Sequence, residues 1–135
     1  MKQLMEATDA VVFHGMVGEE ILADAMGVAT LLVYPCTFPE TSCMVAIEAQ
    51  AAGLPIVGRA FGALPETCAG DVGTLVDGDP YDSGWQQLFV DECVAIANDR
   101  ERWNACNSAG RKATAETYDW NVIVDKWDSY LRGLL

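Results

Sequence analysis

Short hydrophobic runs alternate with helical patterns over the first half of the chain. Continuous apolar runs at 10–16, 30–35, 54–59 and 72–77 predict four short buried strands. Between them, apolar positions spaced three and four residues apart predict helices at 19–27 and 42–53 that end at Gly27 and Gly53, and LPET at 64–67 predicts one helical turn. Strands and helices in alternation indicate an α/β fold with a parallel sheet.

Helical periodicity continues from about residue 82 to the end and predicts three helices at 85–99, 100–118 and 120–134. We therefore interpret residues 1–135 as a single partial domain, with an α/β sheet part at 1–78 and a helical part at 79–135. Doubly wound sheets usually carry five or six strands, so about four strands lead us to expect an upstream portion outside this sequence. The four tryptophans are expected to pack in the core and between helices: Trp85, Trp103, Trp120 and Trp127.

Charge and cysteine content narrow the classes of partner and compartment. The chain has 8 Lys and Arg against 20 Asp and Glu, a formal net charge of −12, which argues against nucleic acid and anionic membranes as partners. No apolar run has the roughly 20 residues of a bilayer span. The five cysteines have no CxxC spacing and indicate reduced thiols in a cytoplasmic protein. The single His14 has no neighbour at metal-ligand spacing, so no metal site is expected.

Two glutamates in the stretch PCTFPETSCMVAIEAQAAGLPIV are the candidate binding residues. Glu40 lies in the loop that follows the strand at 30–35, and Glu48 lies inside the helix at 42–53. Ligands of open parallel sheets bind beyond the carboxyl ends of the strands, where this loop is expected to lie. With Ser42 as the N-cap, the first N–H groups of the helix would form an anion site suited to a diphosphate.

The position of Glu48 suggests a second type of contact. It lies about 6 Å along the helix axis from the first turn, where a carboxylate can accept hydrogen bonds from vicinal hydroxyls such as those of a ribose. Glu40 can do the same for a sugar, and the combination points to a nucleotide sugar. The alternative is that both side chains are simply solvated, Glu40 in its loop and Glu48 on an exposed helix face.

The motifs around the two glutamates resemble the C-terminal domain of retaining GT-B glycosyltransferases, in the glycogen-synthase and sucrose-synthase-like group 1 family. The matching motifs, in chain order, are FHG with Val17, the EX7E pair, EAQAAGLPIV, GALPE, GTLVDGDP and YDW. The resemblance covers residues 7 to 131. It implies a partial Rossmann-like sheet and transfer of a sugar from a nucleotide diphosphate donor, with no metal and no cofactor beyond that donor.

The same resemblance implies roles for individual residues. Glu40 matches the glutamate that contacts the donor sugar hydroxyls, and it is the catalytic-site candidate. Glu48 matches the glutamate that holds the ribose hydroxyls. The other donor-binding positions are the backbone turn Thr41, Ser42, Cys43 and Met44, then Val17 near the base, and Gly62 beside the cleft.

Several features depart from the family pattern. Ser42 and Cys43 stand where members often have Phe and Gly, so the Cys43 side chain is expected to narrow the cleft. Arg59 stands at a position that is commonly small, and it is either an exposed residue or a cation of the cleft. The Arg and Lys that grip the diphosphate, and the acceptor-side domain, belong to parts of the family that this sequence does not include.

We therefore interpret the chain as a glycosyltransferase fragment that binds a nucleotide sugar, and we expect it to be inactive alone. A first alternative is a catalytically inactive, stand-alone module that binds a nucleotide or only associates. In either case we expect a homo-oligomer formed through the exposed sheet edge or apolar surface. A second alternative is a nucleotide-sugar epimerase, which shares the two-domain architecture but fits the paired GALPE and EX7E motifs less well.

Overall fold

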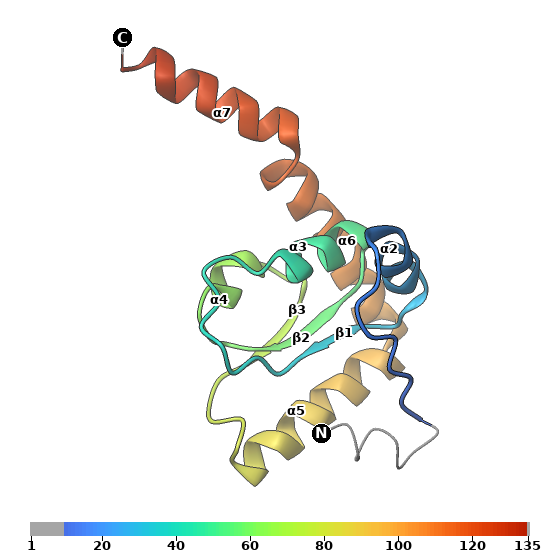
Figure 1. The fold of residues 1–135 in the computed structure, drawn as a ribbon. Coiled ribbons are helices and arrows are strands. Elements are labelled where there is room, and N and C mark those ends of the chain that lie inside the picture. Colours follow the sequence, from blue (N-terminus) through green and yellow to red (C-terminus); the bar gives the residue numbers. More distant parts are fainter. Residues whose placement is uncertain (1–9, 135) are drawn as a thin grey trace.

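The centre of the computed structural model, which describes residues 10–134, is a sheet of three parallel strands (Figure 1). The strands β1 (Leu32–Tyr34), β2 (Ile56–Arg59) and β3 (Gly73–Val76) lie in the order β1-β2-β3. Both pairings are parallel, with Leu32 opposite Ile56 and Ile56 opposite Gly73. The predicted α/β class and parallel sheet are confirmed.

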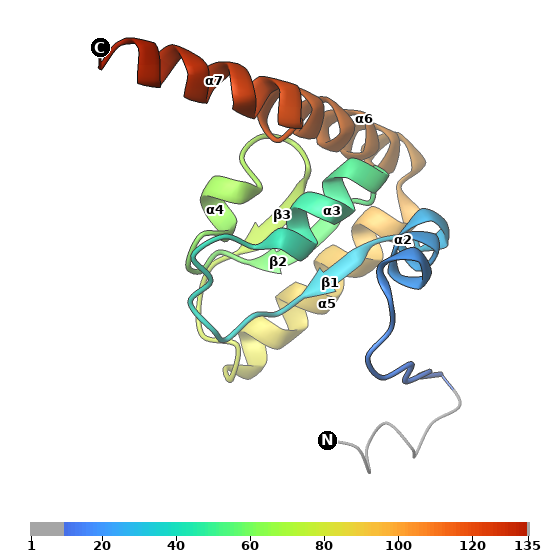
Figure 2. The ribbon, with the colours of Figure 1, turned by 45° about the horizontal axis from the view of Figure 1, so that its top comes forward.

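Helices cover both faces of the sheet. The helices within residues 10–134 are α2 (Glu19–Val28), α3 (Met44–Ala52), the single turn α4 (Leu64–Thr67), α5 (Ser83–Asn98), α6 (Arg100–Thr117) and α7 (Trp120–Arg132). Figures 1 and 2 show α5 on one face of the sheet, and α3 and α6 on the other. Each of these helices was predicted, although α2 continues through Gly27 to Val28 instead of ending at the glycine.

Consecutive residues of β2 belong to two separate cores. Ile56 is fully buried in a cluster with Ala46 and Ala49 of α3, whereas Val57 is fully buried against Phe89 of α5. Since side chains alternate between the faces of a strand, the sheet separates two apolar layers. This arrangement explains why the neighbouring residues Ile56 and Val57 are both apolar instead of alternating with polar residues.

The C-terminal end of α3 is held by side chains of α6. Gly53 ends α3, as predicted, and it adopts the left-handed conformation with φ 75°. The amide of Asn107 donates to the carbonyl of Gly53 at 2.6 Å, and the guanidinium of Arg111 donates to the carbonyl of Ala52 at 2.7 Å. These bonds satisfy carbonyls that a helix end leaves without partners, and Arg111 also complements the helix dipole.

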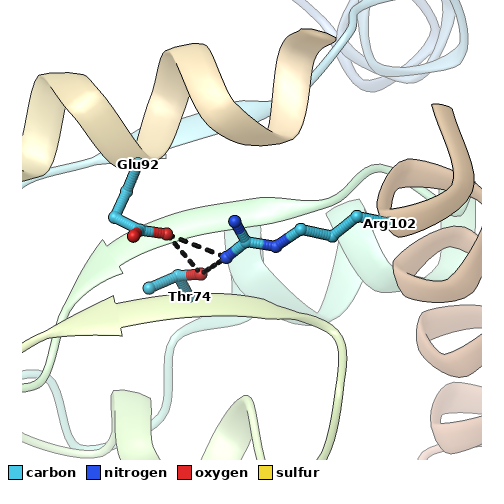
Figure 3. Close-up of polar contacts among 3 residues, drawn as sticks. All are labelled: Thr74, Glu92 and Arg102. Atoms are coloured by element: carbon cyan, nitrogen blue, oxygen red, sulfur yellow. Dashed lines mark hydrogen bonds and ion pairs between the residues drawn. The ribbon is translucent and has the colours of Figure 1, made fainter. Parts of the chain in front are cut away.

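A small polar network joins α5 and α6 to strand β3 of the sheet (Figure 3). Arg102 of α6 lies 2.8 Å from the carboxylate of Glu92 on α5 and donates to the hydroxyl of Thr74 on β3 at 2.6 Å. The hydrogen bond from Arg102 lowers the pKa of Glu92 below its ordinary value. The network is half-buried and far from either glutamate of the candidate site in sequence, so we assign it to the packing of α5 and α6.

The strand predicted at 10–16 is wrong. Residues 11–15 are irregular, and the side chains of Val12 and Phe13 are 71% and 69% exposed. A short apolar run becomes a strand only where a neighbouring strand pairs with its backbone and helices cover its faces. Within residues 10–134 nothing provides that pairing, and the sheet has three strands instead of about four.

The helix α7 extends away from the body and carries the C-terminal end outward (Figures 1 and 2). None of its residues is buried, and Trp120 and Trp127 are 77% and 59% exposed. The predicted core packing is therefore wrong for these two tryptophans, while Trp85 is buried and Trp103 donates to the carbonyl of Thr30 at 2.6 Å. None of the helices within residues 10–134 combines the length and apolar character of a bilayer span.

Candidate functional site

The carboxylate of Glu40 is held at the carboxyl end of β1. Tyr34, the last residue of that strand, donates its hydroxyl hydrogen to Oε1 of Glu40 across 2.8 Å. This hydrogen bond is the main reason that the pKa of Tyr34 is raised above its ordinary value, with burial as the second. Together Tyr34 and Glu40 border a pocket of about 370 Å³ whose other lining residues are Pro35, Cys36, Thr37 and Phe38.

The GALPE loop packs directly on the backbone of Glu40. The N–H of Ala63 donates to the carbonyl of Glu40 at 2.8 Å. Gly62 has φ +57°, and a Cβ at this position would lie 2.7 Å from the nitrogen and 2.8 Å from the oxygen of Glu40. Only glycine fits both the left-handed backbone and the close approach. The structure thus brings together two of the predicted site residues, Gly62 and Glu40.

The N-terminus of α3 begins one residue later than the sequence pattern indicates. Cys43, not Ser42, occupies the N-cap position, and its side chain makes no capping hydrogen bond. Cys43 is 1% exposed and packs in the core, so burial of its side chain fixes where the helix starts and leaves Ser42 outside. Burial also raises the pKa of the Cys43 thiol.

Three residues at the start of α3 are exposed to solvent. Thr41 and Ser42 form an exposed bend, and the side chain of Met44 is 67% exposed. The first carbonyl acceptor of the helix is that of Cys43, which receives hydrogen bonds from the N–H groups of Ala46 and Ile47. The preceding N–H groups, those of Met44 and Val45, therefore lie at an uncapped helix end with positive partial charge.

Glu48 borders a different pocket from Glu40. It is exposed on α3 and lines a space of about 540 Å³ together with other residues of α2, α3 and α6: Glu19, Leu22, Ala23, Met26, Gly27, Ala51, Ala52 and Arg111. No residue of this set lines the pocket beside Glu40. The structure therefore does not bring the two glutamates into one cavity. Val17 is half-buried in the irregular stretch just before α2.

Arg59, His14 and the cysteines were also considered from the sequence. Arg59 donates Nε to the carbonyl of Gly78 at 2.9 Å, and its guanidinium lies 4.3 Å from the ring centre of Phe61. His14 is exposed in an irregular segment. Within the described part of the chain no three His, Cys, Asp or Glu side chains are grouped to hold a metal, and the five cysteines are free.

Tyr34 is the site residue that sequence reasoning missed. The available signal was a hydroxyl-bearing aromatic at the last position of an otherwise apolar strand, directly before Pro35 and on the expected ligand side. Its hydrogen bond to Glu40 depends on the conformation of the loop at 35–43. The spacing of apolar residues along the sequence does not predict a loop conformation.

The sequence matches a family model described as glycosyl transferases group 1 over residues 1–99. It is 48% identical over 117 residues to a D-inositol 3-phosphate glycosyltransferase of Streptomyces griseus subsp. griseus, covering 84% of this chain and 23% of that protein. It is 30% identical over 132 residues to a GDP-mannose-dependent alpha-(1-6)-phosphatidylinositol monomannoside mannosyltransferase of Mycobacterium tuberculosis, covering 93% of this chain and 33% of that protein.

These alignments cover most of this chain but only about a quarter to a third of the relatives' own lengths. The family model alone covers well over half of the 135 residues. The chain belongs to the group 1 family of glycosyltransferases.

Proposed function

We propose that this chain is the donor-binding portion of a cytoplasmic glycosyltransferase, which holds a nucleotide-diphosphate sugar for transfer to an acceptor. In this proposal Glu40 accepts hydrogen bonds from hydroxyls of the donor sugar. The N-terminal amides of α3 bind the diphosphate, and Glu48 accepts from the ribose hydroxyls. The further donor contacts come from Val17, the turn 41–44 and Gly62.

The observation that carries the proposal is the fixed carboxylate of Glu40 beside the uncapped end of α3. Tyr34 holds its side chain at 2.8 Å, and Ala63 holds its backbone at the same distance. An acceptor-only group next to free N–H donors suits a ligand that offers hydroxyl donors at one end and an anion beside them.

The charge of the chain limits how a diphosphate could be bound. With a net charge of −12 and only eight Lys and Arg, backbone N–H groups have to supply most of the attraction within this chain. Transfer also requires that an acceptor be fixed against the donor and water be excluded. We therefore propose that residues 1–135 bind the donor but do not transfer the sugar by themselves.

The two pockets can serve one ligand only if it spans both. Glu48 borders the space between α2 and α3, and Glu40 borders the space beyond β1. An extended nucleotide sugar that passes the start of α3 would place its sugar near Glu40 and its ribose near Glu48. A ligand that fills only one pocket would depend on only one of the two carboxylates.

Isothermal titration calorimetry of the 135-residue chain tests the proposal, with UDP-glucose, GDP-mannose and ADP-glucose and the corresponding nucleoside diphosphates. Glu48→Ala should weaken binding of both the sugar and the diphosphate ligands, because it removes a ribose contact. Glu116→Ala, which makes the same charge change at an exposed position of α6, is the matched control. If none of the six ligands binds, donor binding by this chain is refuted.

Association without catalysis is a second candidate function, and the exposed face of α7 is the observation that favours it. Trp120, Val124, Trp127, Tyr130 and Leu131 recur at helical spacing and are each more than half exposed. β1 also lies at the edge of the sheet, with Val33 51% exposed. Multi-angle light scattering that gives a concentration-independent oligomer, together with no nucleotide binding, would favour this function.

A further inference from the structure

We propose that Tyr34 is a positioning residue for donor-sugar recognition: its hydroxyl fixes the carboxylate of Glu40 so that the second oxygen faces the sugar hydroxyls. This inference rests on the proposed function, because it assigns the neighbouring pocket to the sugar end of the donor. Tyr34 is not itself proposed to react.

The hydroxyl of Tyr34 comes from a rigid part of the fold. Tyr34 closes β1 and pairs with Gly58 of β2 in the parallel ladder. Its half-buried ring packs against the core cluster formed by α3, β2 and α4. Because Tyr34 belongs to a hydrogen-bonded strand, the position of its hydroxyl is fixed. The side chain of Glu40 must therefore adopt the rotamer that reaches this hydroxyl.

The backbone of Glu40 is fixed independently of its side chain. The N–H of Ala63 donates to its carbonyl at 2.8 Å, and its own N–H donates to the carbonyl of Phe38 at 2.9 Å. With the backbone held, the remaining freedom of Glu40 is its side-chain rotamers, which cost free energy to order. The hydrogen bond from Tyr34 selects among these rotamers before any ligand arrives.

This geometry leaves one carboxylate oxygen for a ligand. Oε1 accepts a hydrogen bond from Tyr34, and within residues 10–134 no donor makes a hydrogen bond to Oε2. The pocket of about 370 Å³ beside it is lined by both side chains. An ionised carboxylate is an acceptor only, so the matching ligand presents hydroxyl hydrogens, as a hexose does.

A tyrosine hydroxyl already keeps its proton near neutral pH at its ordinary pKa of about 10, and the hydrogen bond to Glu40 raises the pKa of Tyr34 further. The nearby thiols of Cys36 and Cys43 also contribute to that shift. The Tyr34 hydroxyl therefore remains a donor toward the carboxylate of Glu40.

The first test needs no ligand. With ¹³Cζ-labelled tyrosine, Tyr34→Phe identifies the Tyr34 resonance among the four tyrosines of the chain, and Glu40→Ala should shift that resonance alone. A Tyr34 resonance that does not respond to Glu40→Ala shows that the hydrogen bond is absent in solution. That result would overturn the inference and leave the proposed donor binding standing.

The second test separates the sugar from the nucleotide. For the nucleotide sugar that binds, Tyr34→Phe should weaken its affinity about tenfold or more, as expected for loss of one hydrogen bond to a charged partner. The affinity for the parent nucleoside diphosphate should stay the same, because that ligand has no sugar to meet Glu40. A merely structural defect would weaken both ligands equally. Tyr81→Phe, at a 79% exposed position, is the control and should change neither.

The outcomes distinguish the two proposals. If nucleotide sugars bind and depend on Glu48, but Tyr34→Phe changes the two affinities equally or not at all, the positioning role is refuted while donor binding stands. If neither ligand class binds, donor binding fails and the positioning role fails with it. Selective loss of sugar-dependent affinity supports both.

Discussion

Replacement of Gly62 by alanine is expected to destabilise the chain at the contact between the GALPE loop and the loop that carries Glu40. Gly62 has φ +57°, and a left-handed backbone costs a non-glycine residue about 1–2 kcal/mol. The added methyl would also lie 2.7 Å and 2.8 Å from the backbone nitrogen and oxygen of Glu40. Such overpacking costs about 1–3 kcal/mol, so the sum is about 2–5 kcal/mol.

Gly70→Ala is the matched control for this substitution. Gly70 has φ +92°, and a Cβ there meets nothing within 4 Å. It therefore carries the cost of the backbone conformation without the contact, about 1–2 kcal/mol. The difference between the two variants isolates the packing of Gly62 on Glu40.

Urea denaturation followed by tryptophan fluorescence measures both variants, since the buried Trp85 reports unfolding. Calorimetry on the folded Gly62→Ala protein should also show weaker binding of the nucleotide sugar, because the loop can relieve the overlap only by displacing Glu40. Equal free energies of unfolding for Gly62→Ala and Gly70→Ala, within about 0.5 kcal/mol, would show that the loops do not constrain each other.

Three further predictions concern packing, charge and the exposed helix. Ile96→Ala should lower the free energy of unfolding by about 2–5 kcal/mol, because its fully buried side chain leaves a cavity between α5 and the sheet; a loss under about 1 kcal/mol in urea denaturation would contradict that packing. Arg102 lowers the pKa of Glu92, so the carboxylate stabilises the fold above the unfolded-state pKa and loses this contribution as pH falls through the lower folded-state value. The stability difference between the wild type and Glu92→Gln should therefore be constant near neutral pH and shrink below about pH 4, and it should be modest because both side chains are partly exposed; a difference that grows on acidification would contradict the assignment. Replacing both Trp120 and Trp127 by glutamine should reduce self-association in light scattering without lowering the urea midpoint, because neither side chain is buried; unchanged association would place the contact elsewhere.

Local sequence signals predicted the part of the fold that depends on neighbours along the chain. The apolar runs predicted β1, β2 and β3 within one or two residues at each end, and Gly53 was correctly predicted as the end of α3. Gly62 was selected through the family resemblance as a residue beside the cleft, and donor binding by it stays a prediction. The close packing of Gly62 on the backbone of Glu40 was not predicted.

The errors arise where a structure depends on partners distant in sequence. The run at 10–16 has strand composition, but no strand pairs with it within residues 10–134. Trp120 and Trp127 have the spacing of a buried helix face, yet no element within residues 10–134 buries that face of α7. Helix α3 starts one residue later than predicted because burial of Cys43 outweighs the preference of Ser42 for the N-cap position.

The candidate site shows the same division. The helical rise correctly separates Glu48 from the start of α3 along the axis. It says nothing of the direction in which the side chain points or of how α2 packs beside it, and so the separate pockets of Glu40 and Glu48 were not predicted. The hydrogen bond from Tyr34 likewise depends on the loop conformation.

The bonds from Asn107 and Arg111 to the end of α3 have a consequence for synthesis on the ribosome. They join residues 54 and 59 positions apart, and the contact of Trp103 with Thr30 spans 73. A nascent chain released only as far as β3 contains all three strands and α3. The sheet face that α5 covers is then still open to water, and the other face lacks α6. Because long-range contacts form only after the intervening chain has emerged, the sheet has to wait for α5 and α6, and chaperones would meet it in that interval.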